Sequence, residues 1–171
     1  MPIQRLNHAV LYVRDVARSV AFYRDALGFD VIEGGDVFAG AAFLRADGST
    51  NDHDLGLFQI GAEAGPSAAG RTTVGLYHLA WEVDTLAELQ RIEARLIELG
   101  ALVGSSDHST TKALYAKDPD GLEFEVSWLV PAQLLTDEIR SKRNEIHRLD
   151  LSAEIDRFGA HTRGGVGVSI S

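Results

Sequence analysis

The sequence predicts an α+β fold in which two similar βαβββ modules pair to form a curved sheet around a cavity, followed by a C-terminal helical tail. The first observation is an internal repeat. His8 and His78 lie in similar strand-like segments 70 residues apart, and the glycines that end two predicted helices, Gly28 and Gly100, lie 72 residues apart. The second is a set of short apolar runs separated by glycine and aspartate, which indicates antiparallel strands. The third is a change to a charged composition after Pro131.

The first module begins with a strand-like segment, residues 5–13, which is rich in apolar and β-branched residues. A helix should follow, because Asp15 can cap its start, Gly28 can adopt the left-handed conformation at its end, and apolar residues recur between them at helical spacing. Three strands are expected next, and they lie in the segments 29–35, 36–48 and 53–61.

The second module repeats this order. Residues 75–83 form a strand, and Thr85 with Glu88 forms a capping box for the next helix. The inner face of that helix is expected to carry Leu86, Leu89, Leu96 and Leu99. We assign residues 1–61 to the first module, 62–74 to a linker, 75–130 to the second module, and 131–171 to a C-terminal helix and a glycine-rich tail.

Composition excludes several classes of function. The 171 residues carry a net charge of −9, which argues against binding to nucleic acid or to an anionic membrane. The sequence contains no apolar run long enough to span a bilayer and no secretory signal, so we expect a cytoplasmic protein. With no cysteine, any metal site would depend on histidine, aspartate and glutamate.

The last predicted strand carries two glutamates. Alternation places Leu122, Phe124, Val126 and Trp128 on the face that meets the helix, and Glu123, Glu125 and Ser127 on the face toward the cavity. A lone histidine in an apolar strand is usually a hydrogen-bonded core residue. His8 and His78, however, occupy matching positions of the repeat, and with a carboxylate on the same cavity they make the 2-His-1-carboxylate set that holds Fe(II) and leaves positions open.

The segments NHAVLYV, YHLAWEV and DPDGLEFE resemble the vicinal oxygen chelate superfamily, which includes glyoxalase I, type I extradiol dioxygenases and bleomycin-resistance proteins. The resemblance covers residue 5 to about residue 130. It implies a paired βαβββ fold and a metal site formed by His8, His78 and Glu125. Fe(II) is the expected metal, with Mn, Ni or Zn as alternatives, and a homodimer is expected.

Within the superfamily, the sequence is most similar to extradiol dioxygenases. His53, just before the last strand of the first module, matches their acid and base residue, while His108 and Tyr115 match residues that contact the substrate. The resemblance implies cleavage of a catechol-type aromatic diol by O2. The stretch from His108 to Tyr115 is shorter than in the larger two-domain enzymes.

Two alternatives stay open. A glyoxalase-type isomerase or lyase resembles this sequence except that it uses a fourth protein ligand, usually glutamate, on the last strand of the first module. Alternation groups His53, Leu55, Leu57 and Gln59 on one face there, so that Gln59 could be such a ligand. The second alternative is a ligand-binding protein without enzymatic activity, like bleomycin-resistance members, which commonly lack the metal triad.

Overall fold

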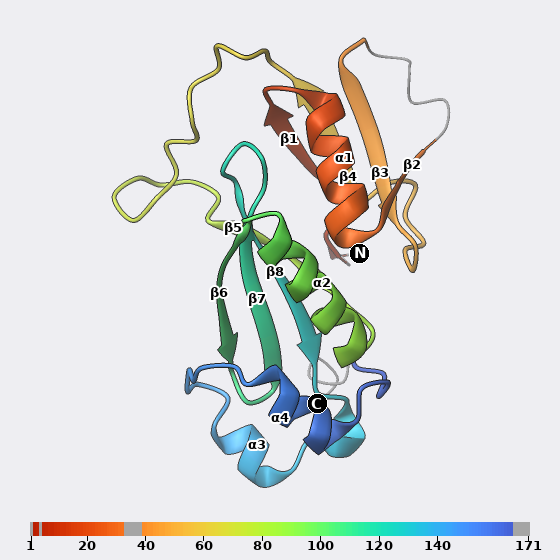
Figure 1. Cartoon of the computed structure of the whole chain (residues 1–171), viewed down its shortest axis with the longest axis vertical. Helices are drawn as coiled ribbons and strands as arrows, with labels where there is room; N and C mark the ends of the chain where they lie inside the picture. Colours follow the sequence, from red (N-terminus) through yellow and green to blue (C-terminus); the bar gives the residue numbers. More distant parts are fainter. Residues whose placement is uncertain (1, 4, 33–38, 166–171) are drawn as a thin grey trace. The chain divides into compact units, whose positions relative to one another are not determined.

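The computed structural model describes residues 2–3, 5–32 and 39–165 and divides into two compact units. The first unit contains Met1–Ser67 and Asp118–Gly121, and the second contains Ala68–Lys117 and Leu122–Ser171. Each unit holds one four-stranded mixed sheet and the helix of one βαβββ module (Figure 1). The predicted α+β class and the two βαβββ modules are confirmed.

The first unit has the strand order β1-β4-β3-β2. Its elements are β1 (Ala9–Val13), α1 (Val16–Leu27), β2 (Phe29–Val31), β3 (Ala41–Ala46) and β4 (Leu55–Gln59). Strands β2, β3 and β4 form the predicted antiparallel meander, and β1 pairs with β4 in parallel. The expected first strand begins at Ala9, so His8 lies just before it. The parts of the expected strands that fall on residues 33–38 lie outside the described residues.

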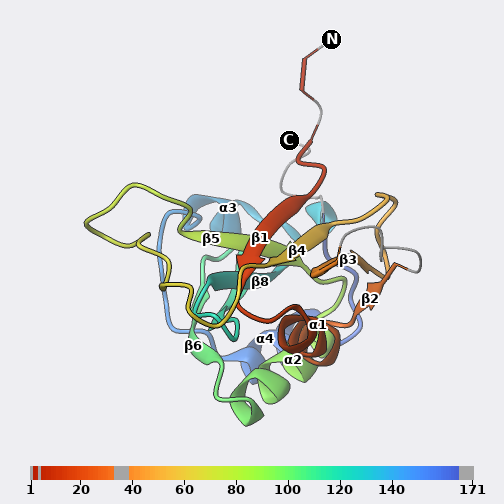
Figure 2. The ribbon, with the colours of Figure 1, turned by 90° about the horizontal axis from the view of Figure 1, so that it is seen from above.

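Helix α1 begins and ends where its capping residues predict. The Asp15 carboxylate accepts a hydrogen bond from the Arg18 backbone N–H at 2.9 Å, and Gly28 ends the helix with φ 73°. The helix packs on one side of the sheet and is seen end-on in Figure 2. Leu44, Leu55 and Leu57 have no exposed area and form the core beneath it.

The second unit has the strand order β5-β8-β7-β6, with β5 parallel to β8. Its elements are β5 (His78–Glu82), α2 (Leu86–Glu98), β6 (Leu102–Asp107), β7 (Thr111–Lys117) and β8 (Glu123–Leu129). The predicted alternation along β8 is confirmed, since Phe124, Val126 and Trp128 are at most 2% exposed.

Thr85 caps helix α2 by accepting a hydrogen bond from the Glu88 backbone N–H, as predicted, and Gly100 has a φ of 64° just beyond the helix. Leu86, Leu89 and Leu96 are fully buried. The prediction for Leu99 is wrong. Leu99 follows the last helical residue as the C-cap and is 40% exposed.

The C-terminal segment contains three short elements in place of the single charged helix that was predicted. They are η2 (Ala132–Leu134), α3 (Asp137–Ser141) and α4 (Leu151–Phe158). Helix α3 ends early, and the chain beyond it runs alongside the sheet, where His147 exchanges two backbone hydrogen bonds with Asp107. The tail residues 166–171 lie outside the described residues. Of the helices in the described ranges, none is long and apolar enough to cross a membrane.

Candidate metal and substrate site

Two of the predicted metal ligands meet within the second unit. His78 opens β5, and Glu125 lies in β8, the parallel neighbour of β5. The His78 Nε2 atom is 3.4 Å from Glu125 Oε2, and both side chains are largely shielded, with 24% and 15% of their areas exposed. Two donor atoms that each lie about 2.1 Å from one ion are separated by about 3.0–3.4 Å. The observed separation therefore fits two ligands of a single cation.

The predicted substrate residues lie close together in the same unit. The Tyr115 hydroxyl is 3.2 Å from His108 Nε2 and 3.3 Å from the Ser106 hydroxyl, and Ser106 Oγ is 2.8 Å from the same histidine nitrogen. Burial, together with the nearby carboxylate of Glu125, raises the pKa of Tyr115 above its ordinary value despite the hydrogen bond from Ser106. The phenol is thus harder to ionise than that of an ordinary tyrosine, and it can donate a hydrogen bond.

Tyr115 also connects this group to the ligand pair. The rings of His78 and Tyr115 meet edge to face, with their centroids 6.0 Å apart. His78, Glu125, Tyr115 and His108 thus form one contiguous polar cluster on the face of the sheet opposite α2. Ser106 belongs to it as well and was not singled out from the sequence. The sequence could have indicated Ser106, because it lies two residues before His108 and residues two apart in a strand point to the same side.

In the first unit, the structure brings His8 and His53 together. Their ring centroids are 4.4 Å apart, and the Phe43 ring contacts His53 edge-on at 5.0 Å. His53 Nδ1 lies 2.9 Å from the exposed carboxylate of Asp52. A second ionisable imidazole thus lies directly beside the predicted ligand His8, as a proton-transferring residue requires.

The loop that carries His53 is organised by Asp54, whose role the sequence did not suggest. The buried Asp54 carboxylate accepts hydrogen bonds from the Ala46 backbone N–H at 2.9 Å, the Ser49 hydroxyl at 2.8 Å and the Asn51 amide at 2.7 Å. Burial by itself would raise the pKa of Asp54, but these hydrogen bonds outweigh it and lower the pKa. The sequence feature that could have suggested this role is an aspartate directly after His53, with the hydrogen-bonding residues Ser49 and Asn51 shortly before it.

The face assigned to β4 from the sequence is wrong for His53. Leu55 and Leu57 are buried beneath α1, and the Gln59 side-chain oxygen accepts a hydrogen bond from the Val16 backbone N–H at 3.2 Å. His53, by contrast, precedes the strand, and its ring lies with His8. Alternation holds only within a continuous strand, so it could not be extended back to His53. Gln59 is therefore on the helix side, where it caps α1.

The repeat identifies the residue that takes the place of Glu125 in the first unit. Val10 pairs with Gly56, and Ala80 pairs with Glu125, while Val10 and Ala80 each lie two residues after their histidine. Gly56 is thus the counterpart of Glu125. A Cβ atom at Gly56 would lie 3.4 Å from Val10 and 3.5 Å from Phe43, so that this part of the sheet is apolar.

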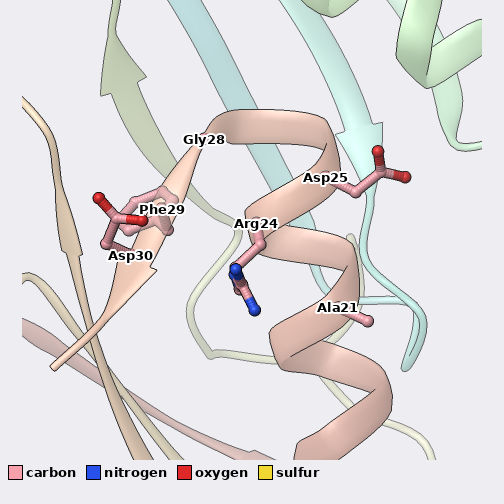
Figure 3. Close-up of a pocket in the computed structure, with 6 residues that line it drawn as sticks. All are labelled: Ala21, Arg24, Asp25, Gly28, Phe29 and Asp30. Carbon is pink, nitrogen blue, oxygen red and sulfur yellow. The ribbon is translucent and has the colours of Figure 1, made fainter. Parts of the chain in front are cut away.

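The complete three-ligand set stays a prediction. His8 belongs to the first unit, whereas His78 and Glu125 belong to the second. Over residues 2–3, 5–32 and 39–165, no three or more His, Asp or Glu side chains are gathered closely enough to hold an ion. A pocket at the end of α1, shown in Figure 3, contains none of the predicted site residues; it is lined by Ala21, Arg24, Asp25, Gly28, Phe29 and Asp30.

Residues 5–126 match the family described as the Glyoxalase/Bleomycin resistance protein/Dioxygenase superfamily, and the chain belongs to this superfamily. The resemblance inferred from the sequence motifs is thereby confirmed. A crystal structure of a glyoxylase/bleomycin resistance protein/dioxygenase domain from Frankia sp. EAN1pec matches with a TM-score of 0.61 at 22% identity, covering 74% of this chain and 92% of that one. At this identity the match shows the fold alone.

Two named relatives match part of this chain. Catechol-2,3-dioxygenase from Bacillus subtilis (strain 168) is 36% identical over 124 residues, which are 71% of this chain and 40% of that protein. Metapyrocatechase 2 from Cupriavidus necator is 29% identical over 101 residues, which are 59% of this chain and 28% of that protein. The chain therefore spans less than half the length of either relative.

Proposed function

We propose that the protein is an extradiol dioxygenase that uses Fe(II) and O2 to open the ring of a catechol-type aromatic diol. The observation that carries the proposal is the convergence of His78 and Glu125 at 3.4 Å, beside the hydrogen-bonded pair Tyr115 and His108. The similarity to catechol-2,3-dioxygenase from Bacillus subtilis (strain 168) supports the same class of reaction.

The residues present fit a divalent metal ion. Imidazole and carboxylate donors suit Fe(II), and a site with three protein ligands leaves coordination positions open. We propose His8 as the third ligand, since it is the repeat counterpart of His78. A bound ferrous ion would supply positions for both oxygens of a diol and for O2, together with the electron transfer that activates O2.

The other residues have separate roles in this proposal. The Tyr115 phenol donates a hydrogen bond to a substrate oxygen, and His108 orients the Tyr115 hydroxyl. His53 acts as the general acid and base, the role that an imidazole side chain most often takes in catalysis. Its ring lies against that of His8, the proposed third ligand.

The repeat position taken by Gly56 argues for the dioxygenase over a glyoxalase-type isomerase. An isomerase of that type uses a fourth protein ligand from the first module, and here glycine stands opposite Val10 while Gln59 caps α1. The first unit therefore has glycine at the repeat position where the isomerase would need its fourth ligand, which supports the dioxygenase.

The experiment is anaerobic loading of the full chain with Fe(II), followed by O2 and a panel of mono- and bicyclic catechols. The expected result is O2 consumption with the yellow ring-opened product. Glu125→Gln should bind Fe(II) at least tenfold more weakly, since it removes a charged ligand. Glu123→Gln, two residues away on the same strand, is the matched control and should retain the metal. Activity with nickel or zinc on a thiol adduct, and none with any diol, would refute the proposal.

A further inference from the structure

Lys112 is a buried lysine that the proposed chemistry does not use. It lies in β7 with no exposed side-chain area, on the face opposite Tyr115. Its Nζ atom lies 2.6 Å from Asp107 Oδ1 and 2.9 Å from Glu154 Oε2, and 5.7 Å from the centre of the Phe158 ring. One ammonium group therefore connects the end of β6 to helix α4.

Placing a fully buried lysine between two largely shielded carboxylates costs desolvation free energy and is an unusual way to hold a helix against a sheet. A well-packed apolar cluster of similar size is often equally or more stable, whereas removal of one partner from a buried ion pair is strongly destabilising. Apolar side chains could also slide over one another, but an ion pair at 2.6–2.9 Å fixes which atoms meet. The cluster is therefore better explained by the geometry that it imposes than by the stability that it adds.

The geometry that it imposes is that of the turn between β6 and β7, residues 107–111, here called the His108 turn. Asp107, the partner of Lys112, directly precedes His108, and its carboxylate also accepts a hydrogen bond from the Ser109 backbone N–H at 2.7 Å. Ser109 has a φ of 64°, a left-handed conformation that is unfavourable for serine without such support.

The C-terminal segment holds this turn at two further points. The Ser109 hydroxyl donates a hydrogen bond to the Ile139 carbonyl of α3 at 3.0 Å, and Asp107 and His147 exchange backbone hydrogen bonds of 2.9 Å each. Figure 1 shows α3 and α4 at the end of the sheet where β6 turns into β7. The His108 turn is thus attached to the C-terminal segment through side chain, main chain and buried charge.

We propose that Lys112 and Glu154 are positioning residues that act through Asp107 to hold His108 in hydrogen-bonding distance of Tyr115 and Ser106. The inference rests on the proposed function for the role of His108 in catalysis, but the attachment itself can be tested without activity. This positioning gives the C-terminal segment an indirect role in the active site, although that segment contributes none of the site residues.

The experiment compares Glu154→Gln with Glu138→Gln in the full chain. Both substitutions remove a carboxylate of the C-terminal segment that pairs with a lysine, but the Glu138 side chain is 70% exposed and the Glu154 side chain only 12%. The first measurement is the ¹⁵N chemical shifts of the histidine side chains, which report the hydrogen bonds of His108. The second is amide hydrogen exchange, in which Ile92 of the core serves as the reference for global stability.

The expected result is that Glu154→Gln shifts the His108 ring signals and speeds exchange of the His108 and Thr110 amides about tenfold relative to Ile92, while Glu138→Gln changes neither. On the iron-loaded protein, kcat should fall about tenfold in Glu154→Gln, with KM changed less than twofold, because a slightly displaced group slows the reaction more than it weakens binding. If Glu154→Gln did not fold, Glu154→Asp, which keeps the charge but shortens the side chain that reaches Lys112, should give the same shifts.

Two outcomes separate this inference from the proposed function. Unchanged His108 signals in folded Glu154→Gln would overturn the positioning role, whether or not the wild-type protein cleaves catechols. Shifted His108 signals in a protein that cleaves no diol would uphold the attachment and refute the dioxygenase. A uniform increase in exchange across Ile92 and the His108 turn would also overturn the inference, because it would mean that the buried charges act on global stability alone.

Discussion

The loop that carries His53 should depend on the Asp54 carboxylate. Replacing Asp54 with alanine removes the acceptor of three hydrogen bonds, from Ala46, Ser49 and Asn51. Hydrogen bonds to a charged acceptor contribute about 1.5–3 kcal/mol each, but the Ser49 and Asn51 side chains are only half-buried and can regain water. We therefore expect a loss of about 3 kcal/mol in the free energy of unfolding at pH 7.

The pH dependence of this effect has a definite sign. The pKa of Asp54 is lowered in the folded state, so the folded protein binds fewer protons there than the unfolded chain. The stabilisation is present above the unfolded pKa of about 3.9 and is lost as the pH falls through the lower folded value. The difference between wild type and Asp54→Asn, which keeps the shape of the side chain, should therefore shrink below about pH 4.

Urea unfolding followed by circular dichroism between pH 7 and pH 3 measures both effects. Asp52→Asn is the matched control, because the Asp52 side chain is 92% exposed, and it should change the unfolding free energy by less than about 0.5 kcal/mol. A wild-type minus Asp54→Asn difference that stayed constant down to pH 3 would refute the assignment of a charged, hydrogen-bonded Asp54.

Three further substitutions test the site and its surroundings. His53→Ala should lower kcat at least a hundredfold and leave the iron content unchanged. Turnover assays and a measurement of bound iron test this, and loss of iron would contradict a proton-transfer role for His53. Gln59→Ala should leave the affinity for Fe(II) unaltered and lower the free energy of unfolding by about 1 kcal/mol, because the hydrogen bond to the Val16 N–H is lost. An Fe(II) affinity that fell tenfold in a titration would show that Gln59 is a ligand. Gly164→Ala should lower stability by about 2 kcal/mol in thermal unfolding, because its Cβ would collide with the Trp128 indole, and an unchanged melting temperature would argue against that contact.

Local chemistry made the helices predictable. Asp15 and Gly28 mark the ends of α1 through contacts within a few residues of the chain, and Thr85 with Glu88 does the same for α2. The alternation along β8 was equally reliable because that strand is continuous from Glu123 to Leu129. Alternation placed Glu123 and Glu125 on the face opposite α2 for the same reason, and the resemblance to the superfamily singled out Glu125 as the predicted ligand.

Long-range pairing and the ends of strands could not be predicted in this way. The parallel pairing of β1 with β4 joins segments far apart in the chain, and no local pattern specifies it. The orientation of His53 depends on the Asp54 hydrogen bonds, which interrupt the alternation before β4. The tail was predicted as one helix because its charges suit a helix, whereas the structure interrupts it where His147 joins Asp107.

The packing of Trp128 bears on how the protein can be shortened. Its indole has no exposed area and donates a hydrogen bond to the Thr162 carbonyl at 3.2 Å, while the Gly164 N–H reaches the Asp84 carbonyl at 2.8 Å. Residues 5–126, the part of the chain that matches the superfamily, end before Trp128. A fragment that ended with the shared region would lack the residues that pack against Trp128, including Thr162 and Gly164. Expression and crystallisation trials should therefore retain the chain through Gly165.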